Sequence, residues 1–160
     1  MDESQPSLEP PRYEDRSSFL VTGLTERYSY PKIEGIPAQW HRFVPHLGKI
    51  PGQAGWTTYG VCFNFDGKGN MDYMCGVEVS DASYPPPGLT QLCIAEQRYA
   101  VFCHRDHISK IGGTWEAIFS RWIPASGHKV VQAPQFEVYG KDFNPQTGNG
   151  GVNIWIPIEQ

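Results

Sequence analysis

The hydrophobic residues of the chain follow two spacings, and each spacing predicts a different kind of element. Runs rich in apolar and β-branched residues, several of them alternating with polar ones, predict strands over residues 18–23, 57–65, 71–79, 89–102, 135–139 and 152–158. Apolar residues at three- and four-residue steps predict helices over residues 31–48 and 108–122. The pattern therefore indicates an α+β fold.

Turn and loop residues separate these elements. The segment DGKGN at 66–70 is typical of a hairpin turn, while 49–56 and 144–151 have the composition of loops. Three consecutive prolines in residues 84–88 predict a linker, because proline interrupts both strand ladders and helix interiors. Residues 1–12 are acidic and proline-rich, and we expect a flexible N-terminal tail there. The element order is β-α-β-β, then the linker, then β-α-β-β again.

The sequence itself also repeats at about half its length. Residues 59–64 match residues 139–144 at Tyr, Gly, Phe and Asn, 80 positions later. Residues 43–48 resemble residues 122–127 in the same way, 79 positions later. Two separate motifs with nearly one offset, together with the repeated element order, indicate an internal duplication with a pseudo-two-fold axis.

The duplication predicts how the domain is organised. We expect a single domain over residues 13–160, with copy one over about 13–83, the linker at 84–88 and copy two over about 89–160. Neither copy alone buries enough apolar surface to be stable, so the two copies should pack together. A central cleft between them is the natural place for a ligand.

Charge and hydropathy exclude two classes of partner. The net charge is −4 and no stripe of Lys or Arg is present, so direct nucleic-acid binding is disfavoured. No apolar run approaches the ~18–20 residues that a membrane span needs, and the N-terminus has no features of a signal or transit peptide. We expect a cytoplasmic protein.

The cysteines and histidines do not suggest a metal site. None of the four cysteines forms a CxxC pair, which argues against zinc and thioredoxin-type motifs and favours buried free thiols in a reducing compartment. His104 and His107, in the segment HRDH, have no third ligand at a usual spacing and are interpreted as loop residues. We expect no metal and no cofactor.

Aromatic residues make up 13% of the chain, and one predicted strand carries an acid among them. Alternation places Glu137 and Tyr139 on one face of strand 135–139. We expect the aliphatic strand faces to pack on the helices, and Glu137, Tyr139 and Trp155 to share the opposite face. An acid flanked by rings suits an organic cation, which gains a counter-charge and cation–π contacts. The alternative is a solvated Glu137, or one paired with Lys or Arg.

The first copy supplies further candidates for the same site. The ligand-binding candidates besides Glu137 are Tyr139, Trp155, Tyr59, Tyr73, Phe63 and Trp115. Trp115 lies on the apolar side of its helix, where a core role competes with a role in the cleft. Glu78 is a second candidate acid, but alternation from Tyr73 places it on the other face.

The chain resembles the GyrI-like small-molecule-binding domain, which is also the effector-binding half of AraC-type and MerR-type multidrug regulators. The resemblance is carried by YGVCFNFDGKGNMDYMCGVEV, YAVFCHRDHISKIGGTWEAIFSRWIPASG, PQFEVYGKDFNP and GGVNIWIPIEQ, in that order. It implies duplicated, SHS2-like β-α-β-β units with a ligand cleft, and a central glutamate that would be Glu137. The twelve-residue tail is too short for a helix-turn-helix, so we expect a stand-alone module similar to those on mobile gene cassettes.

Three functions follow as hypotheses. The first is a non-enzymatic binder of cationic, amphiphilic or aromatic small molecules that acts as a sensor, a sequestering agent or an adaptor. The second is a GyrI-like hydrolase in which Glu137 is the general acid or base. The third is a protein-binding gyrase modulator. A transcription regulator or a second copy of the chain, joined through exposed strand edges, remains open as a protein partner.

Overall fold

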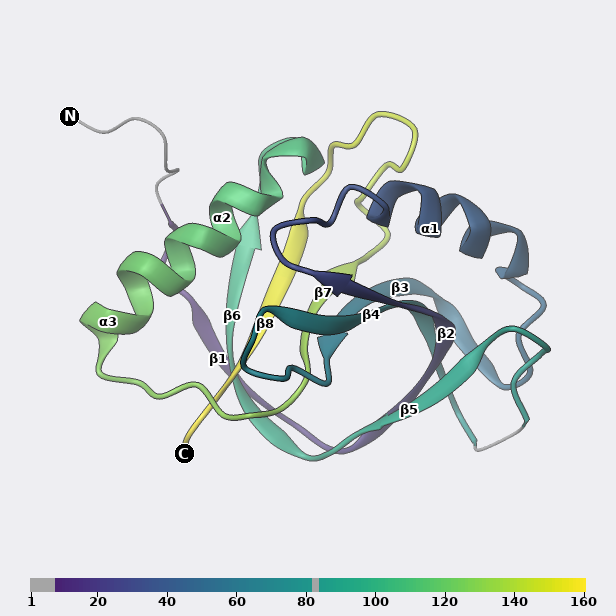
Figure 1. The fold of residues 1–160 in the computed structure, drawn as a ribbon, viewed down its shortest axis with the longest axis horizontal. Helices are drawn as coiled ribbons and strands as arrows, with labels where there is room; N and C mark the ends of the chain where they lie inside the picture. The colour runs from purple at the N-terminus through teal and green to yellow at the C-terminus, as the bar shows by residue number, and fades with distance from the viewer. Residues whose placement is uncertain (1–7, 82–83) are drawn as a thin grey trace.

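The fold is one curled antiparallel sheet with helices on one of its faces (Figure 1). The computed structural model describes residues 8–81 and 84–160. The strand order is β1-β6-β8-β7-β3-β4-β2-β5, and every neighbouring pair is antiparallel. The strands are β1 (Arg12–Arg16), β2 (Phe19–Ser29), β3 (Gln53–Phe63), β4 (Asn70–Val79), β5 (Thr90–Ile94), β6 (Gln97–His104), β7 (Gln135–Tyr139) and β8 (Val152–Ile158).

Two short connections explain why the sheet curls. Residues 17–18 join β1 to β2, and residues 95–96 join β5 to β6, although each pair of strands lies at opposite ends of the strand order. Two residues span only about 7 Å, so the two sheet edges must approach one another. Arg16 on β1 reaches Glu78 on β4 at 2.9 Å, with four strands between them in the order. The sheet therefore has an inner face and an outer face.

The inner face is filled mainly by aromatic and aliphatic side chains. Phe19, Tyr59, Tyr99 and Phe136 are buried in one cluster, and Trp155 packs against it. Phe136 lies 5.5 Å from the ring of Trp155 and 5.7 Å from that of Phe19, which comes from the far side of the curl. This cluster is the core of the curled sheet.

The helices cover the outer face, which is called the helix face below. The first helical segment is α1 (Ile36–Phe43) with the 3₁₀ turn η1 (Val44–His46), packed on β2, β3 and β4. The second segment consists of η2 (Ile108–Lys110), α2 (Ile111–Ala117), the π-type turn η3 (Ile118–Trp122) and α3 (Ile123–Ser126), and it packs on β6 and β8. Figure 1 shows the two segments on the same side of the sheet, to the left and right of its centre.

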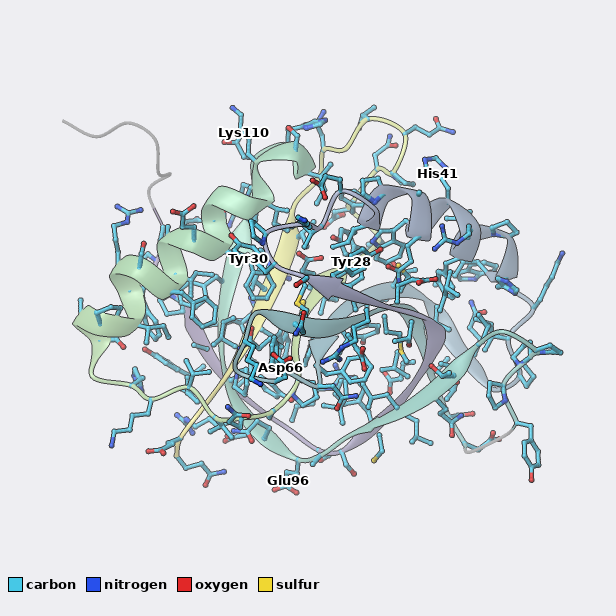
Figure 2. All side chains as sticks on the ribbon, viewed as in Figure 1. Tyr28, Tyr30, His41, Asp66, Glu96 and Lys110 are labelled. Carbon is cyan, nitrogen blue, oxygen red and sulfur yellow. The ribbon has the colours of Figure 1, made fainter. Side chains whose placement is uncertain are left out.

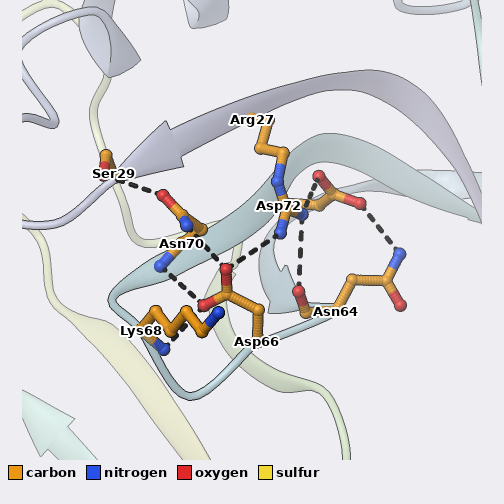
Figure 3. Close-up of polar contacts among 7 residues, drawn as sticks. All are labelled: Arg27, Ser29, Asn64, Asp66, Lys68, Asn70 and Asp72. Atoms are coloured by element: carbon orange, nitrogen blue, oxygen red, sulfur yellow. Dashed lines mark hydrogen bonds and ion pairs between the residues drawn. The ribbon is translucent and has the colours of Figure 1, made fainter.

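The hairpin turn between β3 and β4 is held by its own polar side chains (Figure 3). One oxygen of the Asp66 carboxylate accepts hydrogen bonds from the backbone N–H of Lys68 and of Asn70, and the other accepts one from the Asn70 amide. Arg27 on β2 forms an ion pair of 3.0 Å with Asp72. The turn chemistry of DGKGN, predicted from the sequence, is confirmed.

Element boundaries differ from the prediction where proline or the sheet topology intervenes. The first α-helix covers Ile36–Phe43 instead of 31–48, because Pro45 has no N–H to continue the ladder and the chain tightens into η1. Residues 89–102 form two strands instead of one, because β5 pairs with β2 while β6 pairs with β1 and β8. The strand β3 begins at Gln53, inside the predicted loop.

The N-terminal segment also differs from the expected tail. Residues 1–7 lie outside the described part of the chain. Leu8 packs against the apolar cluster between the second helical segment and the sheet, Glu9 forms an ion pair of 2.8 Å with Arg105, and β1 begins at Arg12. The segment RYEDR lacks an apolar alternation, so the sequence contained no sign of β1.

The match of residues 59–64 with residues 139–144 does not correspond to equivalent places in the fold. β3 continues to Phe63, whereas β7 ends at Tyr139 and Phe143 lies beyond it. Tyr59 belongs to the inner cluster, while Tyr139 hydrogen-bonds on the helix face. An offset of 80 in this region therefore exchanges the two faces of the sheet.

Within the described residues, no helix has the length and apolar character that crossing a membrane requires. All four cysteines are free. Cys75 is buried as predicted for a structural thiol, but Cys93 on the edge strand β5 is exposed, contrary to the expectation of buried thiols.

Candidate functional site

The carboxylate of Glu137 lies buried at the centre of the sheet, surrounded by aromatic hydrogen-bond donors. The residue is 7% exposed and lies on β7, opposite Gly60 of β3. Its oxygens accept hydrogen bonds from the Tyr139 hydroxyl at 2.6 Å, the Trp115 indole Nε1 at 2.8 Å and the Tyr73 hydroxyl at 3.2 Å. The solvated or Lys/Arg-paired alternative for Glu137 is not what the structure shows.

These donors come from both halves of the chain and meet between the two helical segments. Tyr73 lies on β4 and Trp115 on α2, while Trp40 on α1 donates from its indole Nε1 to the Tyr73 hydroxyl at 3.1 Å. The ring of Trp40 also lies 5.2 Å from that of Tyr139, in an edge-to-face arrangement. Trp40, Tyr139 and Trp115 are half-buried, so the cluster closes the site toward the surface.

A glycine makes room for this cluster. A Cβ atom built on Gly60 would lie 2.8 Å from Glu137 Oε1 and would clash with the Tyr73 hydroxyl. Any side chain at position 60 would therefore push the acid and its donor apart. Gly60 is needed here because its missing side chain is the space that the hydrogen bonds occupy.

Gln39 fixes α1 against the strands that frame the site. Its side-chain amide is fully buried and donates to the backbone carbonyls of Leu24 and Tyr73, at 2.9 and 2.8 Å. Its side-chain oxygen accepts a hydrogen bond of 2.7 Å from Tyr28, which Figure 2 shows between the sheet and α1. One polar side chain thus ties the helix to β2 and β4 and sets the position of Trp40.

Burial dominates the electrostatics of the site. Burial raises the pKa of Glu137, and the hydrogen bonds from Tyr139, Trp115 and Tyr73 and the nearby His104 offset only part of this rise. Burial also raises the pKa values of Tyr73, Tyr139, Cys62 and Cys75, each raised further by Glu137. The hydroxyls and thiols are therefore neutral near pH 7, and the site holds a single acid that can be charged. Such an acid can take up either a proton or a cation.

The structure brings together four of the seven predicted site residues. Glu137, Tyr139, Tyr73 and Trp115 form one hydrogen-bonded cluster. Trp115 reaches the acid from its helix, as the sequence allowed.

The other three predicted residues, Trp155, Tyr59 and Phe63, lie on the inner face. The prediction that Trp155 shares a face with Glu137 is wrong, because Trp155 pairs with Phe136 across the strands whereas Glu137 pairs with Ile154. Side chains of directly paired residues point to the same side of the sheet. The same register places Glu137 on the helix face, together with the aliphatic residues of β8, so the expectation that Glu137 lies on the face opposite the helices is also wrong. The Trp155 indole nitrogen is buried without a hydrogen-bond partner in the described part of the chain.

The expected cleft is filled by the aromatic side chains in this structure. A hollow of about 420 Å³ lies elsewhere, on the inner-face side of β6, β7 and β8, lined by Cys103, Val138, Asn153 and the loops near Lys141 and Gly150. The site at Glu137 must therefore open before a ligand of any size can reach the carboxylate.

His104 and His107 have structural roles. His104 is the last residue of β6 and is buried, with Nδ1 2.7 Å from the Thr114 hydroxyl and Nε2 2.9 Å from the His107 carbonyl. His107 caps η2 through the backbone N–H of Ser109. No cluster of three His, Cys, Asp or Glu side chains suited to a metal ion occurs among the described residues.

Sequence reasoning missed Trp40 and Gly60 as parts of the site. Trp40 falls within the apolar spacing that predicts the helix over residues 31–48, and that spacing does not set it apart from the other apolar residues. Its position 79 residues before Phe119, which stacks on Trp115, was the available signal. Gly60 gave no signal, because its role depends on which residue lies across from it.

A model of the GyrI-like small molecule binding domain matches residues 9–159. The transcriptional regulator BrlR of Pseudomonas aeruginosa is 30% identical over 149 residues, which cover 92% of this chain and 54% of BrlR. The chain thus spans about half the length of that relative.

Solved structures share the fold. SAV2435, solved bound to tetraphenylphosphonium, has a TM-score of 0.77 and 21% identity, with 94% of each chain covered. An integron cassette protein from the mobile metagenome of Vibrio cholerae has a TM-score of 0.69 and 17% identity, covering 95% of this chain and 97% of that one. The resemblance seen in the sequence is confirmed, and the chain belongs to the family of GyrI-like small-molecule-binding domains.

Proposed function

We propose that this domain binds lipophilic organic cations at Glu137, between α1 and α2. The observation that carries the proposal is a buried carboxylate whose described partners are three neutral donors, with neither Lys nor Arg among them. Burying an unpaired carboxylate is costly, and a cation would supply the missing counter-charge. The aromatic rings around it offer flat, polarizable surfaces to the organic part of such a ligand.

Ligand entry requires the aromatic donors to move. Trp115 and Tyr139 are half-buried and lie between Glu137 and the surface, so a rotation of their side chains would open the site on the helix face. The carboxylate would then exchange hydrogen bonds for the charge of the ligand. Binding and opening are coupled in this scheme, since the closed arrangement is stable only while Glu137 lacks a cation.

The comparisons support the ligand class. SAV2435 was solved with tetraphenylphosphonium, a permanent organic cation, and its fold covers nearly the whole of this chain. Tetraphenylphosphonium was bound by SAV2435, and the binding of such a cation by this chain is part of the proposal. BrlR is a transcriptional regulator about twice as long as the matched segment, so a sensing role within or beside a regulator is proposed for this domain. Free cysteines support the cytoplasm as the place where it acts.

We also propose that the domain arose by duplication, which would place the site on a pseudo-two-fold axis. Exchanging β1–β4 with β5–β8 gives the same strand order read from the opposite end, and β3 and β7 are the central pair. An offset of 79 maps the helix-face residues of β4 onto those of β8: Cys75, Val77 and Val79 onto Ile154, Ile156 and Ile158. Glu137 and Gly60 pair at this centre, where one copy supplies the acid and the other supplies the space.

Isothermal titration with tetraphenylphosphonium tests the proposal. Wild-type protein should bind, and Glu137→Gln should weaken binding by about tenfold or more, which corresponds to about 1.4 kcal/mol. Glu78→Gln is the matched control, because it removes an equal charge from the opposite face. Equal affinity of wild type and Glu137→Gln, with both folded, would show that Glu137 is not the counter-charge.

A further inference from the structure

The inner face holds a second acid among aromatic rings, and this one already has a cation. Glu78 on β4 accepts a hydrogen bond of 2.9 Å from Arg16 Nη2. Arg16 Nη1 donates to the Tyr59 hydroxyl at 3.4 Å, and its guanidinium centre lies 3.5 Å from the ring centroid of Phe19. We define Phe19, Tyr59 and Glu78 as the guanidinium cage.

The cage matches the shape of a guanidinium group better than that of a compact ammonium ion. The ring of Phe19 packs against the planar group, while Glu78 and Tyr59 accept hydrogen bonds from two of its nitrogens. Planar stacking combined with several fixed N–H donors is what distinguishes arginine from lysine. A quaternary or phosphonium cation has no N–H to donate to these acceptors.

Arg16, which occupies the cage, belongs to a strand that is weakly held in the sheet. β1 is an edge strand of five residues, paired only with β6, and none of its residues is buried. Three of its residues face inward: Arg16 lies in the cage, Glu14 pairs with Tyr99 of β6, and the guanidinium centre of Arg12 lies 6.0 Å from the ring of Trp155. A short strand without buried apolar residues opens at low free energy compared with the rest of the sheet.

The cage is also open to solvent. The side chain of Arg16 is 23% exposed and that of Glu78 is 37% exposed. A ligand from outside could therefore replace Arg16 without crossing the core. The cage lies on the face opposite Glu137, with Tyr59 in the cage and the adjacent Gly60 in the other site.

We propose that the guanidinium cage is a second binding site, that Arg16 is its tethered occupant, and that β1 releases the cage to guanidinium compounds from outside. The site differs from that at Glu137 in its ligand chemistry, and it does not depend on the proposed function. A tether presents Arg16 to the cage at roughly millimolar effective concentration, so a simple competitor must be present at higher concentration.

Thermal unfolding of Arg16→Ala tests the cage with methylguanidinium as the probe. At ionic strength held equal with tetramethylammonium, methylguanidinium at about tens of millimolar should raise the unfolding midpoint of Arg16→Ala, because binding to the folded state stabilises it. The rise should disappear in Arg16→Ala combined with Glu78→Gln. Arg98→Ala is the matched control, since Arg98 pairs with Asp15 and lies over Tyr13 outside the cage. An equal rise in Arg98→Ala, or with tetramethylammonium, would overturn the proposal.

Hydrogen exchange in the wild type tests the release of β1 without any substitution. Methylguanidinium should accelerate amide exchange in residues 12–16 severalfold, while tetramethylammonium should leave it unchanged. Unchanged exchange with methylguanidinium would show that β1 is a fixed strand and Arg16 a purely structural ion pair. Tetraphenylphosphonium binding should be the same in wild type and Arg16→Ala, so failure at one site is distinguishable from failure at the other.

Discussion

The indole Nε1 of Trp115 donates a hydrogen bond of 2.8 Å to Glu137, and this contact connects the second helical segment to the central strand of the sheet. The second oxygen of the acid is held by Tyr139 and Tyr73, so both oxygens are satisfied without a charge partner. In this structure the site is therefore closed by its own aromatic side chains.

Replacing Trp115 by Phe should remove one donor while keeping a ring. We expect the pKa of Glu137 to rise further, because one of the hydrogen bonds that oppose the effect of burial is lost. The free energy of unfolding should fall by about 1–2 kcal/mol at pH values where Glu137 is ionised. NMR titration of the Glu137 carboxyl carbon measures the first effect, and urea unfolding measures the second.

Trp122→Phe is the control for this prediction. Trp122 lies in the same helical segment but packs on Phe102 and His128, away from Glu137. A pKa of Glu137 that moves equally in both variants would contradict the role assigned to the Trp115 indole.

Stability of the ligand-free protein should decrease with pH because of Glu137. Its folded-state pKa lies above the ordinary value of 4.5, so the folded state holds the proton more tightly than the unfolded state. The contribution to stability is complete below the unfolded pKa and is lost as the pH rises through the folded pKa. Urea unfolding at a series of pH values should show this slope in wild type and not in Glu137→Gln. If the free energy of unfolding depends on pH in the same way in both proteins, Glu137 is not the source of the slope.

Gly60→Ala should disturb both stability and ligand binding. Its Cβ would lie 2.8 Å from Glu137 Oε1 and would clash with the Tyr73 hydroxyl, so the acid or its donor must shift. We expect a loss of about 1–3 kcal/mol in the free energy of unfolding, as for other overpacked sites. Gly140→Ala provides the comparison, because its Cβ would have no atom within 4 Å. If calorimetry shows an equal loss in the free energy of unfolding for the two variants, the space at position 60 is not needed.

Gln39→Leu should destabilise the fold although it conserves volume. The substitution leaves the carbonyls of Leu24 and Tyr73 and the hydroxyl of Tyr28 without their partner. Unsatisfied buried groups predict a loss of about 2–4 kcal/mol by urea unfolding. Gln53→Leu, at a half-buried loop-side position with local hydrogen bonds only, should lose less than about 1 kcal/mol. Similar losses would mean that Gln39 is not a special anchor of α1.

Much of the fold could be predicted from local patterns. Turn residues at 66–70 and alternation in 135–139 and 152–158 correspond to a hairpin and two strands in the structure. Alternation also correctly placed Glu137 beside Tyr139, and it directed the aliphatic residues of β8 toward the helices.

Which faces of neighbouring strands lie on the same side of the sheet could not be predicted in the same way. Alternation gives the two faces of each strand, but the pairing of Glu137 with Ile154 decides which face of β7 joins which face of β8. Both faces of this curled sheet are buried, so the apolar character of a residue such as Trp155 does not predict whether it lies on the inner face or on the helix face. β1 was missed because edge strands need little apolar sequence.

The burial of Glu137 has a consequence for weak bases, such as anilines or pyridines, which carry no charge in bulk water at neutral pH. Because burial raises the pKa of Glu137, the acid holds its proton over a wider pH range, and within that range the proton can pass from its oxygen to the nitrogen of an incoming base. The ion pair then forms inside the protein, and no proton is exchanged with the buffer. Permanently charged ligands would instead release the proton into solution. Binding enthalpies measured in buffers of different ionisation enthalpy would therefore distinguish the two kinds of ligand.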